Sequence, residues 1–430
     1  MSTKCRSILF LIGTIIIIIL ITMISLFIQH SGMIQPYFQL KGKQNITISY
    51  TKEYEEEGFI ARSFFRNENE KVQVKHLKIN DQKEEIHYMY EGHTYIRTIQ
   101  KIDDQKPKIT LKGEDTIILF LNEAYEELGV SAKDEMDGDL SHQIKITSNI
   151  KNQQGNYEVI YQVKDQSGNE SIKKRKVIVL EDPMQQQLHY QHDAYENKYE
   201  EWWFEKSKDH QRMNAARTNT FLQKYHAYYQ GIDDKVIYLT FDEGGNDVTY
   251  IKEIAKILDQ YNIKASFFVT ANYLQAEAKW IKEMVNHGHD ILNHSVHHKD
   301  MSQLAHQQRV KEFVYEIKKW EQDYLKITGK KSKPYFRFPK GGFSERSLKM
   351  VSDLGYHTFF WSHAFYDYGN DLRKEEALAS MMDYYHPGAI YLLHPSNKGN
   401  YEALETFIQQ MLEKGYRFAL LDEICKLDKK

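Results

Sequence analysis

The sequence predicts an α/β domain over residues 235–430, preceded by two β-rich modules and an apolar N-terminal helix. From Lys235 onward, short β-branched and aromatic runs alternate with stretches of helical periodicity, which is typical of parallel strands joined by helices. Between Asn45 and Leu180 the chain instead carries short runs of alternating apolar and polar residues, with turn-forming residues between them. One long uncharged apolar stretch precedes both regions.

Length, charge and cysteine content narrow the class of protein. The 430 residues are enough for two or three domains. A net charge of −3, without a basic stripe carrying interleaved aromatic residues, argues against a nucleic-acid partner. Cys5 and Cys425 lie at opposite ends of the chain, and neither has the spacing of a disulfide framework or a thiolate metal site.

The stretch Ile8–Ile28 predicts a membrane anchor, because it is almost wholly apolar, uncharged and long enough to span a bilayer. Lys4 and Arg6 precede it and no Lys or Arg follows until Lys41, so residues 1–7 are expected to stay in the cytoplasm. A cleaved signal peptide is the alternative, but its apolar region would be unusually long and no Ala-x-Ala-like site follows. We therefore expect a single-pass protein of the cell membrane with its remaining domains on the cell-wall side.

We expect residues 29–106 to form a small β-rich extracytoplasmic region. Its runs NITISY, KVQVKHLKI and HTYIRTI alternate apolar and polar residues, as half-buried strands do. The region carries no recognisable chemistry, and we interpret its charged and aromatic residues as solvated strand faces.

Residues 107–181 predict a second β unit, with strands at the runs IILFL, YEVIYQV and RKVIVL and turns at 137–139 and 167–169. This segment resembles the bacterial Ig-like repeats of cell-surface proteins, and the resemblance implies a sandwich used as a spacer or adhesion module. The matching motifs are PKITL at 107–111, GV at 129–130, Asp134, DGDL at 137–140, GNY at 155–157 and YQVKD at 161–165 followed by SGN. Asp134, Asp137 and Asp139 could hold calcium, although turn formation is the more usual role of such residues.

Residues 182–234 are polar and rich in Gln, Tyr and Lys, and we expect a helical linker there. Helical periodicity is present around Tyr195–Phe204 and around Thr220–Tyr229. Trp202, Trp203 and Phe204 are expected to pack the linker onto the following domain, with a sugar-stacking platform as the alternative.

The strands of the α/β domain are expected to end at a shared rim. Strand candidates are 236–241, 265–270, 290–293, 335–338, 358–362, 389–394 and 417–421, and helix candidates are 249–261, 277–287, 303–328, 345–354, 372–385 and 401–413. In α/β barrels the chemistry lies at the carboxyl ends of the strands. Five polar or aromatic residues fall at or just past such ends, namely Asp242, His294, Arg337, Trp361 and His394.

The run Val236–Phe241 is apolar and ends abruptly in Asp242 and Glu243, followed by two glycines. At the frayed end of a strand both carboxylates can turn toward one cleft, whereas the plainer interpretation is a solvated acidic turn. His294 and His298 are four residues apart, a spacing that places both imidazoles on one side of a helical turn. Two histidines and a carboxylate suit a divalent ion such as zinc, and the alternative is a polar loop rich in histidine.

These motifs identify residues from about 221 to 427 as similar to the polysaccharide deacetylases of carbohydrate esterase family 4, the NodB-homology domain. TFDE at 240–243, HSVHH at 294–298, RFPKG at 337–341, WSHAFYDY at 361–368 and YLLH at 391–394 appear in the order of the family's five motifs. The resemblance implies a distorted (β/α)7 barrel and metal-dependent removal of N-acetyl groups. The chain departs from the family pattern at Glu243, where Asp is usual, at Gly245, where Pro is usual, and at Tyr368, where Trp is usual.

Each motif residue receives an expected role. Asp242 would act as the base and Arg337 would hold it ionised; His394 would act as the acid and Asp367 would keep it cationic. Glu243, His294 and His298 would hold the metal, which we expect to be zinc, with cobalt or manganese as alternatives. The oxyanion would be stabilised by the metal and by a backbone N–H just after His298 or near Phe338. Expected substrate contacts are Trp361, Phe365, Gly341 and Phe338.

The stretches 341–356, 359–368 and 386–404 look most like the muramic acid branch of the family, the delta-lactam-forming de-N-acetylases. A lactyl-substituted sugar needs a small rim near Gly341, Gly342 and Ala364, and Lys340 or Lys398 could pair with its carboxylate. We therefore expect deacetylation of N-acetylmuramic acid in peptidoglycan strands. The alternatives are N-acetylglucosamine as the substrate, a metal-assisted hydrolase of another amide or ester, and a catalytically silent surface protein that binds the cell wall.

Overall fold

The computed structural model describes residues 3–30, 36–63, 66–206, 209–244, 249–369 and 372–426, with side chains described over 11–27 in the first of these ranges. The chain forms two compact units. The first comprises Met1–Lys112, Gly129–Ile146 and Ile160–Lys173, and the second comprises Gly113–Leu128, Thr147–Val159 and Lys174–Lys430.

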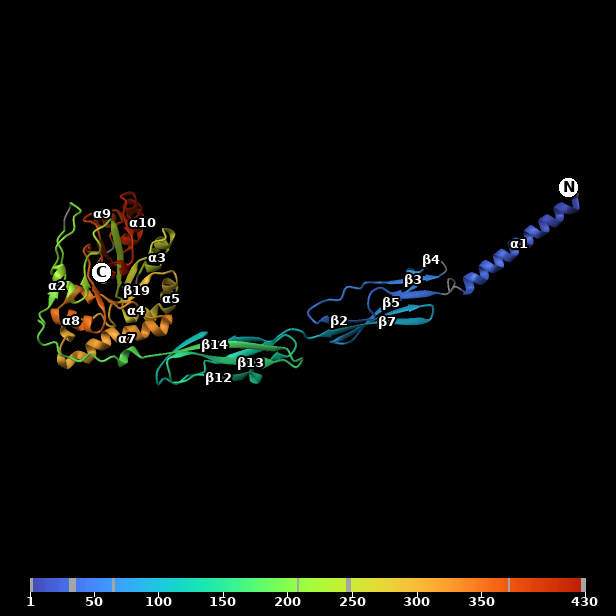
Figure 1. Cartoon of the computed structure of the whole chain (residues 1–430), viewed down its shortest axis with the longest axis horizontal. Helices are drawn as coiled ribbons and strands as arrows, with labels where there is room; N and C mark the ends of the chain where they lie inside the picture. Colours follow the sequence, from blue (N-terminus) through green and yellow to red (C-terminus); the bar gives the residue numbers. More distant parts are fainter. Residues whose placement is uncertain are drawn as a thin grey trace. The chain divides into compact units, whose positions relative to one another are not determined.

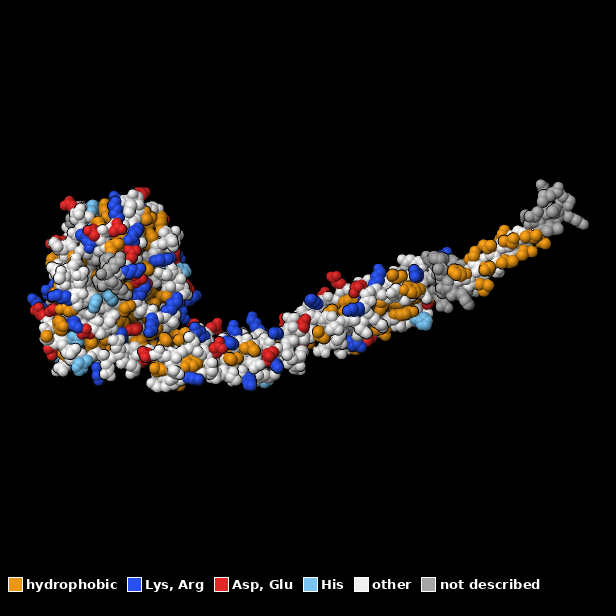
Figure 2. Space-filling model, viewed as in Figure 1, with side chains coloured by type: hydrophobic (Ala, Val, Ile, Leu, Met, Phe, Trp, Pro, Cys, Tyr) orange, Lys and Arg blue, Asp and Glu red, His pale blue; other side chains and the backbone are white. Residues whose placement is uncertain are grey.

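The N-terminal apolar stretch lies in one helix, α1 (Thr3–His30). Its described side chains are mostly large, apolar and exposed, and they form the orange stretch along this helix in Figure 2. Over the part of the chain that is described, no helix reaches the length and apolar character that crossing a membrane requires. The predicted anchor over Ile8–Ile28 extends beyond the described side chains, so it stays a prediction.

The region that follows α1 is β-rich, as expected. Its strands are β1 (Tyr37–Leu40), β2 (Asn45–Ser49), β3 (Phe59–Ser63), β4 (Arg66–Asn67), β5 (Gln73–Asn80), β6 (Lys83–Tyr90) and β7 (His93–Ile102). They form a three-stranded sheet of order β1-β3-β4 and a four-stranded sheet of order β2-β7-β6-β5. Ile86, Tyr88 and Ile99 are buried at the centre of this region, where Phe38 and Phe59 pack against them.

The Ig-like segment also consists of strands. They are β8 (Lys108–Leu111), β9 (Thr116–Phe120), β10 (Val130–Asp134), β11 (Gly138–Asp139), β12 (Lys145–Ser148), β13 (Gly155–Lys164) and β14 (Glu170–Leu180). In the first unit β10 pairs with both β8 and β11, and in the second unit β9 pairs with β14 in parallel register. Asp134 Oδ1 accepts hydrogen bonds from the backbone N–H groups of Met136 and Asp137, which is the turn-forming role.

All seven strands expected after Lys235 are present. They are β17 (Val236–Glu243), β18 (Ser266–Val269), β19 (Asp290–Asn293), β20 (Tyr335–Phe336), β22 (His357–Phe359), β23 (Ala389–Leu393) and β24 (Arg417–Phe418). With β16 (Ala227–Tyr228) they form one parallel sheet of order β16-β22-β20-β19-β18-β17-β23, and β24 also pairs with β17. Single bridges join Gln230 to Ala389 and His363 to Tyr391, so the two ends of the strand order meet.

Helices cover the outside of this sheet, as Figure 1 shows. They are α3 (Ile251–Gln260), α4 (Ala271–Ala276), α5 (Ala278–Asn286), α6 (Met301–Leu304), α7 (Val310–Thr328), α8 (Glu345–Asp353), α9 (Lys374–Met382), α10 (Lys398–Glu413) and α11 (Asp422–Cys425). Six of them coincide with helices that the sequence predicts, and α7 begins later than expected because the short turn Gln307–Arg309 precedes it.

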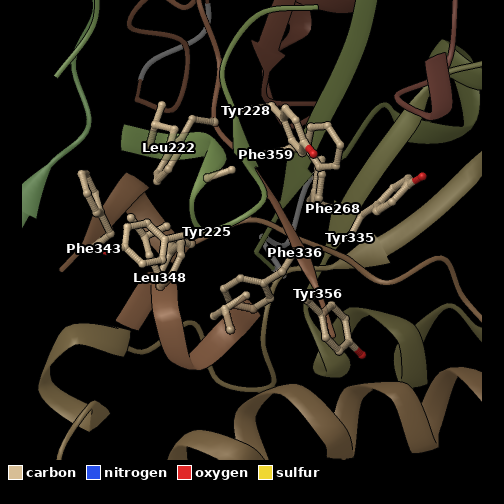
Figure 3. Close-up of a cluster of buried hydrophobic side chains, with 14 of the residues drawn as sticks. Leu222, Tyr225, Tyr228, Phe268, Tyr335, Phe336, Phe343, Leu348, Tyr356 and Phe359 are labelled. Carbon is tan, nitrogen blue, oxygen red and sulfur yellow. The ribbon is translucent and has the colours of Figure 1, made fainter. Parts of the chain in front are cut away.

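Strand β17 separates two buried clusters, because successive side chains of a strand point to opposite faces. Val236 and Tyr238 lie in a cluster with Phe268, which Figure 3 shows among other aromatic side chains. Ile237, Leu239 and Phe241 lie in a second cluster with residues of α3, α5 and α10. Each fully buried side chain of this size contributes about 1.5–3 kcal/mol to folding, so β17 is strongly fixed in the sheet.

The linker over residues 182–234 is wrongly predicted as helical. Its only α-helix in the described range is α2 (Asn219–Gln223), and residues 195–204 contain no helix but include β15 (Glu200–Glu201), which pairs with β21 (Gly342–Phe343). The apolar residues here follow a period of two: Trp202 is buried and Trp203 is exposed. Trp202 packs onto the domain as expected, stacked on Phe360 with ring centroids 4.1 Å apart.

Candidate active site

The structure brings the expected rim residues together at the carboxyl ends of the strands. Asp242 is the seventh residue of β17, and His294 directly follows β19. Arg337 follows β20 and His394 follows β23. Because these strands are parallel neighbours, their carboxyl ends open on one edge of the sheet.

Asp242 and Arg337 form a buried ion pair. Arg337 Nη1 donates to Asp242 Oδ1 at 2.6 Å and to Thr240 Oγ1 at 2.8 Å. Arg337 Nε donates to the carbonyl oxygen of Phe359 at 2.9 Å. Burial alone would raise the pKa of Asp242, but the charge and hydrogen bond of Arg337, with a smaller contribution from His394, hold it below the usual value. The carboxylate is therefore ionised and fixed in orientation.

His294 and His298 face each other across the same site, with ring centroids 4.9 Å apart. His294 Nδ1 lies 3.0 Å from the carbonyl oxygen of Arg337 and donates to it, which leaves the lone pair on Nε2. Burial lowers the pKa of His294 to about 4 and also lowers that of His298, so both rings are neutral at pH 7. His297 points elsewhere, as predicted, and its Nδ1 pairs with Glu316 at 2.7 Å.

The donor set fits a divalent metal. His294 Nε2 lies 3.7 Å from Asp242 Oδ2, which is too long for a hydrogen bond. Two ligands of a tetrahedral zinc ion stand about 3.4 Å apart when each is about 2.0–2.1 Å from the metal. Neutral imidazole is also the form of histidine that binds metals. The arrangement of these atoms is therefore compatible with the expected zinc site.

Glu243 is buried, and its position in β17 bears on its expected role as a metal ligand. The strand does not fray at this end: Asp242 pairs with Phe268 and Glu243 with Val269 in regular parallel register. Strand alternation then places Asp242 on the face toward the histidines and Glu243 on the opposite face. The charge of Asp242 opposes the lowering of the pKa of both His294 and His298. Metal ligation by Glu243 stays a prediction.

His394 and Asp367 form the second ionisable pair of the site. His394 Nδ1 and Asp367 Oδ1 are 2.6 Å apart, and the backbone N–H of His394 donates to Asp367 Oδ2 at 2.8 Å. Asn400 Nδ2 donates to the same Oδ2 at 2.6 Å. Burial lowers the pKa of His394, but the bond to Asp367 and the charges of Asp367, Asp242 and Glu243 outweigh it, and the pKa lies above its usual value. Its surroundings therefore stabilise the protonated form of His394.

The expected substrate residues divide between core and rim. Phe338 is fully buried and stacks on Phe360, so only its backbone is available to a substrate. Trp361 is largely buried, and a Cβ on Gly341 would lie 2.7 Å from its ring. Phe365 is half-buried, edge-on to His363. Substrate contacts of these residues stay predictions.

Sequence reasoning missed two residues of the linker. Asn197 and Tyr199 line a cavity of about 650 Å³ together with His298, Lys340 and Gly342. No motif includes Asn197 or Tyr199, and the only available signal was the strand-like alternation of the Trp202 segment. Tyr368, where the family usually has Trp, is exposed and lies edge-on to His394, with 5.4 Å between the ring centroids.

Comparison with known proteins agrees with this geometry. Residues 230–359 match the family model "Polysaccharide deacetylase", and residues 109–179 match "Bacterial surface protein, Ig-like domain". The chain is 37% identical over 238 residues to the peptidoglycan-N-acetylmuramic acid deacetylase PdaA of Bacillus subtilis, covering 54% of this chain and 89% of that protein. It is 26% identical over 203 residues to a peptidoglycan-N-acetylglucosamine deacetylase of Bacillus cereus, covering 45% of this chain and 90% of that protein.

The solved structure of Bacillus subtilis PdaA, described as a family 4 carbohydrate esterase, superposes with a TM-score of 0.51 at 37% identity. This superposition covers 55% of the present chain and all of the PdaA chain. The chain therefore belongs to the polysaccharide deacetylases of carbohydrate esterase family 4, hydrolases of amide bonds, and carries an additional Ig-like domain.

Proposed function

We propose that this enzyme removes the N-acetyl group from N-acetylmuramic acid in peptidoglycan glycan strands. The observation that carries the proposal is that one rim of the sheet holds both Asp242, whose pKa is lowered beside Arg337, and His394, whose pKa is raised by its hydrogen bond to Asp367. Two titratable groups whose surroundings push them toward opposite protonation states are the signature of an acid and a base that share one reaction. The similarity to PdaA supports muramic acid as the sugar.

Asp242 acts as the general base. Its carboxylate accepts the proton of the attacking water, and Arg337 keeps it ionised and correctly oriented through the 2.6 Å hydrogen bond to Oδ1. The other N–H groups of Arg337 are held by Thr240 and by backbone oxygens, so the guanidinium does not move with the substrate. Oδ2 of Asp242 remains directed toward His294.

His394 acts as the general acid. The Nδ1–H is held by Asp367, which leaves Nε2–H to donate its proton to the departing amine nitrogen. Asn400 and the backbone N–H of His394 fix the Asp367 carboxylate in turn. These contacts orient the imidazole and favour its protonated form before the substrate binds.

Family members generally depend on a divalent metal, and His294 and His298, with Asp242 or Glu243, would hold it in this chain. When bound, such an ion acidifies water and polarises the acetamide carbonyl. The neutral state and the inward Nε2 of His294 support this assignment. Zinc is the proposed ion, because two imidazoles and a carboxylate are a common zinc set, and cobalt and manganese remain alternatives.

The proposed location is the cell-wall side of the cell membrane, with Ile8–Ile28 as the anchor. The support comes from the sequence: an uncharged apolar run preceded by Lys4 and Arg6. The Ig-like domain would then act as a spacer or wall contact between the anchor and the enzyme.

Acetate release from purified glycan strands tests the proposed activity. Mass spectrometry of the digested products should show acetyl groups lost from muramic acid residues, and a chelator should stop the reaction. The Asp242→Asn protein is the matched inactive control, because Asn cannot accept the proton. Loss of acetyl only from glucosamine residues would reject muramic acid as the substrate, and no loss from either sugar would reject the deacetylase activity.

A further inference from the structure

The cavity beside His298 is a polar hollow that neither the general base nor the general acid uses. Its volume is about 650 Å³, and its lining includes His298, Asn197, Tyr199, Asp300 and Lys340. Because His298 belongs to the active site, a substituent on a sugar bound there can enter this hollow without leaving the reacting centre.

The walls of the hollow are fixed by their own hydrogen bonds. Asn197 Nδ2 donates to the carbonyl oxygen of Ser302 at 3.1 Å, and its Oδ1 accepts from Ser344 Oγ at 2.7 Å. Asp300 Oδ1 accepts from both the N–H and the Oγ of Ser302, where it caps helix α6. These polar groups are therefore committed to holding the linker and α6 in place.

Lys340 differs from these wall residues. Its side chain is exposed, and among the described residues its ammonium has no recorded hydrogen bond or ion pair. Its backbone is left-handed, with φ +58° and ψ +9°, a conformation that is strained for a residue with a Cβ. Glycine would relieve this strain, so Lys340→Gly removes the side chain without straining the backbone.

We propose that Lys340 recognises the carboxylate of the 3-O-lactyl group of muramic acid, and that the hollow receives this group. The inference rests on the proposed function. The lactyl ether is attached to the ring carbon next to the one that bears the acetamide, so a sugar reacting at the site places a carboxylate a few ångströms from the reacting bond. N-acetylglucosamine carries an uncharged hydroxyl at that position and gains nothing from the ammonium.

Lys398, the other lysine expected to pair with this carboxylate, has a partner on its own helix. Lys398 Nζ lies 3.0 Å from Glu402 Oε1, one turn further along α10. It does not line the hollow. Lys398→Met is therefore a matched control, because it removes one lysine charge from the same domain without touching the proposed subsite.

The test compares two substrates with wild type and three variants. The substrates are glycan strands with a free lactyl carboxylate and the same strands with that carboxylate capped as a methylamide. For wild type, capping should lower kcat/KM about 10-fold, the effect of losing one hydrogen bond to a charged group. Lys340→Met should lose a similar factor on the free carboxylate, lose little on the capped substrate and thus show no preference between the two. Lys340→Gly, which relieves the backbone strain, should show the same kinetic effects without any fall in melting temperature. Lys398→Met should behave as wild type.

The outcomes separate this inference from the proposed function. Wild type that deacetylates free and capped muramic acid equally well, or a Lys340→Met protein that keeps the preference for the free carboxylate, would overturn the role of Lys340 alone. Wild type that releases acetate only from glucosamine residues would overturn both the substrate and the subsite. A loss in Lys398→Met with none in Lys340→Met would move the subsite to α10.

Discussion

Arg337 Nη1 lies 2.6 Å from Asp242 Oδ1, and both side chains are buried at the rim of the sheet. The pair unites two separate motifs, since Asp242 ends β17 and Arg337 follows β20. A buried charge without its partner is far more costly than either an exposed charge or an intact pair. We therefore expect the two residues to act as one unit in stability and, under the proposed mechanism, in catalysis.

Replacing Arg337 by Met should raise the pKa of Asp242, because burial then acts without the opposing positive charge. In the wild type the low pKa contributes stability above the unfolded pKa, and this stability is lost as the pH falls through the folded pKa. The variant should unfold about 3–5 kcal/mol more easily at pH 7. The acid limb of its pH–rate profile should move to higher pH.

Urea unfolding and a pH–rate profile check this prediction. Arg417→Met is the control, because its pairs with Glu423 are exposed, so its loss should change stability by less than about 1 kcal/mol. Arg337→Lys keeps a charge and serves if the Met protein does not fold. The acid limb should shift less in Arg337→Lys than in Arg337→Met, and an acid limb that stays in place in Arg337→Met would contradict the role of Arg337.

His394→Ala should lower kcat roughly 10²–10⁴-fold, the usual range for one general acid. Asp367→Asn should have a smaller effect and a distinct signature. Asp367 contributes most to raising the pKa of His394, so its loss should lower that pKa. Because activity needs the protonated ring, the alkaline limb of the pH–rate profile should move to lower pH. An alkaline limb that stays where it is in Asp367→Asn would show that His394 is not the titrating acid.

His294→Ala should abolish metal binding and activity while the protein stays folded. The two ligands that remain after this change are too few to hold the ion. His297→Ala is the matched control: it lies in the same loop, but its imidazole pairs with Glu316 away from the site. Elemental analysis of the dialysed proteins should find metal in His297→Ala and none in His294→Ala. Activity that survives a chelator, in protein shown to contain no metal, would refute metal dependence.

The strands and helices after Lys235 could be predicted because the local pattern and the tertiary role agree. Val236–Phe241 is continuously apolar, as a strand covered on both faces must be, and the structure buries every residue of β17. The motif residues could also be placed, since parallel strands bring their carboxyl ends to one edge. What the sequence could not decide is whether Asp242 or Glu243 faces the histidines, because that depends on how far β17 stays paired.

The linker over residues 182–234 shows why its conformation and its two cavity residues could not be predicted. The residues around Trp202 fit a helical period in sequence, but Trp202 stacks on Phe360, more than 150 residues away, and β15 pairs with β21. Such long-range contacts override local propensity. Asn197 and Tyr199 reach the cavity through this pairing, so the local alternation around Trp202 could have indicated an extended segment but not its place beside the cavity.

The predicted anchor can be tested in cells. Protease added to intact protoplasts should remove the catalytic domain, because residues beyond Ile28 are expected on the outer side. A cytoplasmic protein probed in the same sample controls for lysis. Protection of the catalytic domain would contradict the orientation, and a soluble mature form that begins after residue 28 would favour the cleaved signal peptide.

Gly341, an expected substrate residue, lies directly against the side chains of Trp361 and Trp202. Its φ is +68°, and a Cβ would lie 2.7 Å from the Trp361 ring and 3.0 Å from Trp202 Cβ. Gly341→Ala therefore combines backbone strain with a steric clash and should lower stability by about 2–4 kcal/mol. Gly355→Ala is the matched control: its φ is +87°, but nothing lies within 4 Å of the added Cβ, so only the strain of about 1 kcal/mol remains. Thermal unfolding should show the larger loss for Gly341→Ala, and its kcat/KM should fall because Trp361 and Trp202 must shift. Equal melting temperatures for the two variants would show that the Trp361 ring yields without cost, and Gly341 would then be needed for its backbone alone.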